Sequence, residues 1–130
     1  MSEAEIERVV QEFVNTLASD FGVSPPRVMV VKPRAFAKLC SPGSAACYRW
    51  WDESIVLLEG HESLGYVLHE FWHHYQYVKG GRKIDRAFPS EDFDKPHCKR
   101  TFERDAKVFE KSFDIFYSEV WERLVGKRRG

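Results

Sequence analysis

Three segments of this 130-residue chain repeat their apolar residues at the spacing of one helix face. They run from Ser2 to Phe21, from Ser63 to Lys79 and from about Arg100 to Val125. The first opens with Ser2 and Glu5 in the arrangement of a capping box, which marks the start of a helix. Long amphipathic helices must bury their stripes against one another or against a sheet, so this pattern limits the chain to a few architectures.

The sequence between the first two helices predicts a small sheet. Arg27 to Lys32 is a short β-branched run suited to a buried strand, and Ala35 to Leu39 can form one helical turn. Ala46 to Trp51 and Ser54 to Leu58 flank a short polar turn, as in a β-hairpin. We therefore expect an α+β fold with an N-terminal helix, a small antiparallel or mixed sheet, a central helix and a C-terminal helix.

Length and composition predict a single globular domain over residues 1–130. Hydrophobic residues make up 43% of the chain, enough for a core, and charged residues make up 31%, enough to solvate a surface. The formal net charge is zero, so no overall field attracts nucleic acid or an anionic membrane. The polar stretch from Gly81 to His97, interrupted by Pro89 and Pro96, is expected to be a long loop.

The cysteines and the first residues bear on the compartment. Cys40, Cys47 and Cys98 are odd in number and lack the spacing of a metal knuckle, which favours a reducing setting. Cys40 and Cys47 could pair or bind metal, but we interpret them as isolated, small, buried residues. The start of the chain is acidic and lacks the pattern of an export signal. No apolar run approaches the roughly 20 residues that span a bilayer. We expect a cytoplasmic protein with no membrane partner.

His69, Glu70 and His73 form an HExxH motif within the second helical segment. Residues i and i+4 share a helix face, so two imidazoles can bind one metal ion while the glutamate reaches a metal-bound water. Helical phase places both histidines on the side of Tyr66 and Tyr77, away from the apolar stripe. The motif therefore predicts a metal site in a cleft wall, with Glu70 as the catalytic base.

A catalytic zinc site normally has a third protein ligand. The metzincin pattern is excluded, because Gln76 and Lys79 stand where it requires glycine and histidine. Helical phase places Glu103 and Asp105 symmetrically about the apolar stripe of the last helix and does not separate them. The downstream candidates are His97, Cys98, Glu103, Asp105 and Glu110, of which Glu110 reads best as a surface charge.

Glu103 and Ala106, some thirty residues after the HExxH motif, resemble the ExxA element of the minimal gluzincins, or minigluzincins. This resemblance to very small zinc metallopeptidases implies Zn²⁺ held by His69, His73 and Glu103, with Ala106 letting the two helices approach. It also implies an edge strand that binds substrate and a latent form in which a terminal segment fills the cleft. SprT-like and ImmA-type proteases are wider relatives with the same helix.

The chain departs from that pattern in places. Thermolysin-like gluzincins carry an acid four residues after the glutamate ligand, where this chain has Lys107, so Asp105 or another group would have to support the ligands. His74 is expected to support the site, contact substrate or be exposed. The group that stabilises the oxyanion stays open among Tyr48, Tyr66, Tyr75, Tyr77, Tyr117 and His97.

These features together predict zinc-dependent hydrolysis of peptide bonds in extended polypeptides. The strand from Ser54 to Leu58 could bind the substrate at a sheet edge, although its apolar sequence fits an interior strand equally well. The alternatives are a non-catalytic metal-binding or regulatory module and a SprT-like protease recruited to DNA. Trp50 and Trp51 with the basic residues from Lys99 to Lys111 would serve the last, but interleaved acids make nucleic-acid binding the less favoured reading.

Overall fold

The computed structural model describes residues 2–41, 43–81 and 101–126 and confirms the α+β class. Residues 82–97 of the expected loop, including His97, lie outside the described part, as does Cys98. No helix in the described ranges is long and apolar enough to cross a membrane. The elements are α1 (Glu3–Phe21), β1 (Arg27–Val31), α2 (Pro33–Leu39), β2 (Ala46–Arg49), β3 (Ser54–Leu58), α3 (Leu64–Lys79), α5 (Thr101–Trp121) and the π-helical η3 (Glu122–Gly126).

The three strands form a mixed sheet with β3 in the centre, in the order β1-β3-β2. Val56 of β3 lies opposite Met29 of the parallel strand β1 and opposite Cys47 of the antiparallel strand β2. The hairpin prediction is confirmed, but the idea that the segment from Ser54 to Leu58 is an edge strand is wrong. Its apolar side chains are buried on both faces of the sheet, and the edge strands are β1 and β2.

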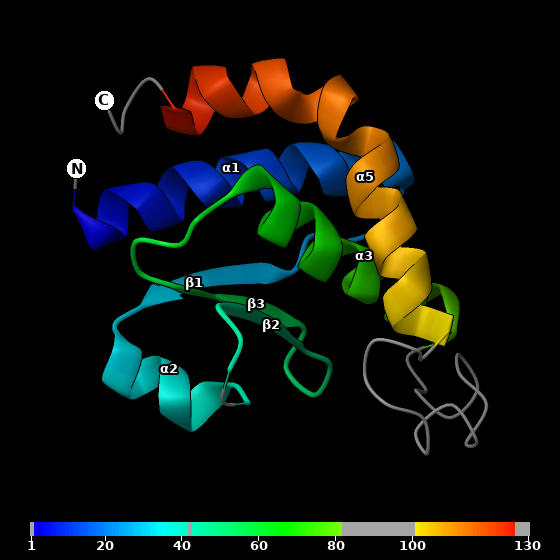
Figure 1. Cartoon of the computed structure of the whole chain (residues 1–130). Coiled ribbons are helices and arrows are strands. Elements are labelled where there is room, and N and C mark those ends of the chain that lie inside the picture. Colours follow the sequence, from blue (N-terminus) through cyan, green and yellow to red (C-terminus); the bar gives the residue numbers. More distant parts are fainter. Residues whose placement is uncertain (1, 42, 82–100, 127–130) are drawn as a thin grey trace.

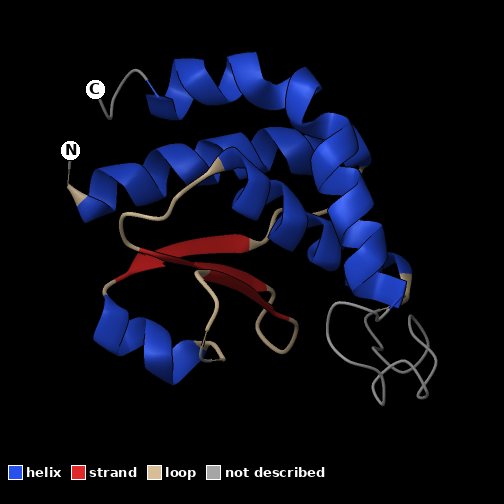
Figure 2. Cartoon of the chain, in the orientation of Figure 1, coloured by secondary structure: helices blue, strands red, loops and turns tan. Residues whose placement is uncertain are grey.

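Helices cover both faces of the sheet (Figures 1 and 2). The main core lies between the sheet and α1, α3 and α5, where Phe13, Leu17 and Phe71 are fully buried. A smaller cluster on the opposite face packs Phe36 of α2 against Val56. The hydrophobic effect therefore holds the sheet in a helix–sheet–helix sandwich, with α3 next to β2.

Side chains of α1 close the outer edge of β1. Gln11 Oε1 accepts a hydrogen bond from the Val28 amide at 2.8 Å, and Glu7 Oε2 accepts one from the Val30 amide at 2.9 Å. Unpaired amides on an edge strand invite pairing with another chain, and these two bonds remove that possibility on β1. Within the described residues no strand pairs with the outer edge of β2, so the sheet opens only there.

Helix α5 is fixed by its C-terminal half. The Tyr117 hydroxyl donates to Asp20 Oδ2 at 2.8 Å, and the rings of Tyr117 and Trp121 meet Phe13 edge-to-face. Ala106, near the other end of α5, has no exposed surface. This small side chain lets α5 approach α3 closely while α1 holds the far end (Figure 1).

Cys40 and Cys47 form a disulfide that joins the C-terminal cap of α2 to β2. Their Cα atoms are 5.9 Å apart, within the usual range for such a bond. The interpretation of these two residues as isolated thiols is therefore wrong. The intervening loop folds back so that the end of α2 meets the edge strand, a relationship that residue spacing does not reveal.

Candidate metal centre

Helix α3 begins where the sequence predicts. The Ser63 hydroxyl accepts a hydrogen bond from the Tyr66 amide at 3.2 Å and caps the helix, which continues to Lys79. Leu68 lies against the core, whereas His69 and His73 face the cleft, one turn apart, with ring centroids separated by 4.9 Å. The helical-phase argument is confirmed.

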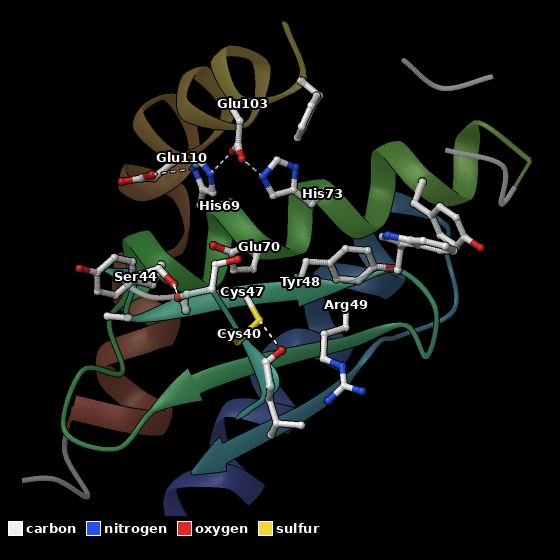
Figure 3. Close-up of a pocket in the computed structure, with 18 of the residues that line it drawn as sticks. Cys40, Ser44, Cys47, Tyr48, Arg49, His69, Glu70, His73, Glu103 and Glu110 are labelled. Carbon is white, nitrogen blue, oxygen red and sulfur yellow. Dashed lines mark hydrogen bonds and ion pairs between the residues drawn. A yellow bond between two sulfur atoms is a disulfide. The ribbon is translucent and has the colours of Figure 1, made fainter. Parts of the chain in front are cut away.

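Glu103 of α5 meets both imidazoles. Its Oε1 lies 2.9 Å from Nε2 of His69 and 2.7 Å from Nε2 of His73 (Figure 3). One ligand atom from each of the three residues lies within 4.8 Å of the others, and all three side chains are largely buried. The structure thus brings together the three residues that the sequence singles out, from two helices.

The other nitrogen of each ring has its own acceptor. Nδ1 of His69 lies 3.2 Å from Glu110 Oε1, and Nδ1 of His73 lies 2.9 Å from Gln76 Oε1. The contact at His73 is a hydrogen bond, and the contact at His69 is an ion pair. A ring whose proton is on Nδ1 can present the lone pair of Nε2 to a cation beside the Glu103 oxygen. Three converging electron-pair donors suit a bound cation.

The amide of Gln76 is itself oriented by α5. Its Nε2 donates to Asp105 Oδ2 at 2.8 Å and to the Phe102 carbonyl at 3.0 Å, which leaves Oε1 to face His73. The Trp72 indole also donates to Asp105 Oδ2, at 2.7 Å. Asp105 therefore lies outside the ligand group and supports His73 through Gln76, a role that the sequence leaves open to it.

The electrostatic setting favours a positive charge at His73. Burial alone would lower the pKa of His73, but the hydrogen bond to Glu103, the negative charges of Glu70 and Glu103, and the Gln76 acceptor together raise the pKa above its ordinary value. The same carboxylates would stabilise a metal cation at this place.

Glu70 completes the constellation. It lines the cleft, is only 8% exposed, and lies between the two histidines and the sheet in Figure 3. Its position next to His69 in α3 gives it access to a ligand held by the three-residue group without competing for the same place. This is the position that a general base for a metal-bound water requires.

The site opens into a cleft of about 910 Å³ between β2, α3 and α5. Its lining includes the Cys40–Cys47 disulfide and the aromatic residues Tyr66, Trp50 and Tyr77. The cleft therefore runs along the edge strand β2, all of whose residues line it.

Two expectations need correction. His74 is fully buried, with Nδ1 2.8 Å from the Tyr48 hydroxyl and Nε2 2.7 Å from the Ser24 carbonyl, so it is not exposed and does not line the cleft, and a supporting role through Tyr48 stays open. Glu110 is no free surface charge, because it contacts His69. Its signal in the sequence is the seven-residue spacing from Glu103, two helical turns that put both acids on one face.

The choice of an oxyanion-stabilising group is narrowed but stays open. Tyr75 packs against the hydrophobic core, and the Tyr117 hydroxyl is bonded to Asp20. The remaining described candidates, Tyr48, Tyr66 and Tyr77, line the cleft, and of these the Tyr48 hydroxyl contacts Nδ1 of His74.

No family model matches the chain, and neither the curated proteins nor the solved structures include a significant match. The functional argument therefore depends on the geometry of the centre.

Proposed function

We propose that this protein is a zinc-dependent peptidase that hydrolyses peptide bonds in extended polypeptides. The single observation that carries the proposal is the convergence of His69, His73 and Glu103 on one point beside Glu70. Two imidazole nitrogens, one carboxylate oxygen and a neighbouring general base form the donor set of a catalytic zinc site. The resemblance to minimal gluzincins supports the same reading.

The residues present fit a zinc ion. Zinc takes imidazole and carboxylate ligands in tetrahedral sites, and three protein ligands leave one position for water or substrate. Both histidines have an oxygen neighbour at Nδ1, from Glu110 or Gln76, which suits the tautomer needed for binding through Nε2. When bound, zinc would polarise the scissile carbonyl and lower the pKa of a coordinated water.

The chain supplies the proton transfers. Glu70 would remove a proton from the attacking water while the water oxygen bonds to the carbonyl carbon of the substrate. The carbon–nitrogen bond then breaks, and Glu70 returns the proton to the leaving amine, so that a carboxylic acid and an amine are formed. Enclosure of Glu70 at 8% exposure strengthens its interactions with the reacting groups.

The open edge of β2 is the proposed substrate platform. The Leu58 amide donates to the Ala45 carbonyl, so alternation along the ladder turns the main-chain groups of Ala46 away from β3. A peptide added along this edge would lie in the cleft and carry its backbone past the metal centre. Main-chain pairing of this kind accepts many sequences but requires an extended substrate.

Self-inhibition by a terminal segment gains no support from the described elements. Neither α1 nor η3 contributes a residue to the cleft lining, because α1 is packed into the main core and Val125 of η3 is buried with it. Latency stays a prediction of the resemblance.

Hydrolysis of an unfolded protein by the zinc-loaded chain tests the proposal, with Glu70→Gln as the inactive variant. The carboxamide keeps the shape of Glu70 but cannot accept the proton, so we expect a loss of turnover of at least 100-fold with zinc content unchanged. Glu119→Gln, an exposed substitution on α5, is the matched control. Equal cleavage by Glu70→Gln would refute the mechanism, and stoichiometric zinc without any cleavage would favour a non-catalytic metal-binding module.

A further inference from the structure

We infer that Glu110 is the positioning residue for His69 and that the absence of a side chain at Gly65 leaves the space in which Glu110 lies. The inference rests on the proposed metal centre. Glu110 Oε1 lies 3.2 Å from Nδ1 of His69, and the two side chains are 25% and 17% exposed. This contact joins α5 to α3 beside the Glu103 contact (Figure 3).

A carboxylate beside Nδ1 affects both the orientation and the basicity of an imidazole ligand. It holds the proton on Nδ1, so the ring cannot turn its Nε2 lone pair away from the site, and it makes Nε2 more basic. His73 has only the neutral amide of Gln76 at the equivalent atom. At Nδ1, His69 therefore has a charged neighbour and His73 a neutral one, so the two rings are positioned by different groups.

Gly65 explains how Glu110 can reach the ring. A Cβ built at Gly65 would lie 3.0 Å from Oε2 of Glu110 and 3.6 Å from its Cδ, closer than ordinary van der Waals contact for the oxygen. Any side chain at this position would press on the carboxylate that faces His69. The space over Gly65 is thus occupied by the Glu110 carboxylate.

The backbone gives no other reason for a glycine at this position. Gly65 is the second residue of α3 and is absent from the glycines with positive φ among the described residues. Alanine is the better helix former, by about 1 kcal/mol in a helix interior. Helix propensity therefore does not favour glycine at this position, and the place that the Glu110 carboxylate takes above Gly65 is the reason that the structure offers.

The test measures zinc affinity of the full chain by competition with a chromophoric chelator, and the thermal midpoint of the metal-free protein. We expect Glu110→Ala and Glu110→Gln to weaken zinc binding 10- to 100-fold. Gly65→Ala should weaken it in the same direction while leaving the metal-free midpoint unchanged or higher. Weaker zinc binding without a lower thermal midpoint would show that the positioning of the ligand, and not the fold, is lost.

The double variant Gly65→Ala, Glu110→Ala sharpens the test. Because both changes act through one contact, the double variant should bind zinc no more weakly than Glu110→Ala alone. Cobalt substituted for zinc should show an altered visible spectrum in Glu110→Gln and Gly65→Ala, and the parental spectrum in the control Glu119→Gln.

Wild-type zinc affinity in Glu110→Ala, or independent losses that multiply in the double variant, would overturn the positioning role while leaving the metal centre intact. A wild-type chain that binds no zinc would overturn the centre and the inference together. Zinc binding that weakens as expected in a chain without peptidase activity would retain the positioning role and remove only the proposed hydrolysis.

Discussion

The Nε2 atom of His73 lies 2.7 Å from Oε1 of Glu103, across thirty positions of the sequence and between two helices. Local sequence places only the histidine; the packing of α5 on α3 and α1 brings the glutamate to it. Anything that shifts α5 should therefore affect the centre, whereas substitutions elsewhere on the surface should not.

Removing the proposed ligand Glu103 should abolish tight metal binding, whereas replacing Asp105, two positions further along α5, should not. Glu103→Ala leaves two imidazoles on one helix, and we expect zinc affinity to fall by more than 100-fold. Asp105 is bonded to Gln76 and Trp72 and reaches His73 through Gln76, so Asp105→Asn should cost at most about tenfold. Metal analysis after dialysis against a competing chelator measures both. Equal losses in the two variants would show that the ligand assignment is wrong.

Strand addition on β2 predicts a dependence on alternate peptide amides. In an added strand every second amide of the peptide faces β2, so N-methylation at those positions removes a hydrogen bond, while N-methylation at the intervening positions does not. We expect one of two alternately methylated peptides to lose affinity for the zinc-loaded Glu70→Gln variant by at least tenfold. Fluorescence anisotropy of labelled peptides measures the difference. Identical binding of the two would contradict this mode of recognition.

The contacts that close β1 should stabilise the fold without affecting the metal centre. Glu7→Ala leaves the buried Val30 amide without its acceptor, and we expect a loss of about 2 kcal/mol in the free energy of unfolding. Glu7→Gln keeps an acceptor oxygen and should cost less. Urea denaturation measures the stabilities, and zinc affinity should stay at the wild-type value. An unchanged stability in Glu7→Ala would mean that the β1 edge does not depend on this bond.

The hydrogen bond between Tyr117 and Asp20 gives a pH dependence away from the centre. Burial, the bond to Asp20 and its negative charge raise the pKa of Tyr117 well above its ordinary value. A raised folded-state pKa contributes stability below the unfolded-state pKa, about 10, and that stability is lost as the pH rises through the folded-state value. Stability should therefore fall above about pH 10 in the wild type, and less steeply in Tyr117→Phe. Equal slopes in urea denaturation at alkaline pH would contradict this.

Periodicity alone predicts the helices and the hairpin well. Helix α3 was expected from Ser63 to Lys79 and runs from Leu64, with Ser63 as its cap. The order of the strands could not be predicted in this way, because the apolar run of β3 suits an edge or an interior position equally. Its place in the sheet depends on which neighbours bury it, and that is a tertiary property.

The candidate site likewise combines features that local sequence predicts with features that depend on tertiary packing. The histidine pair and Glu70 follow from one helical turn, but phase gives no choice between Glu103 and Asp105. In the structure Glu103 contacts both imidazoles, whereas Asp105 is bonded to Trp72 and Gln76. The burial of His74 depends on partners 26 and 50 positions away in the chain, which no local pattern contains. The Cys40–Cys47 bond likewise depends on how the loop after α2 returns.

The measurement that bears most directly on this account is anomalous diffraction at the zinc absorption edge from crystals grown with zinc. If the proposed centre is correct, one strong peak lies about 2.0 to 2.2 Å from Nε2 of His69, Nε2 of His73 and a carboxylate oxygen of Glu103. A peak on other residues, or zinc absent from these three under saturating conditions, would contradict it.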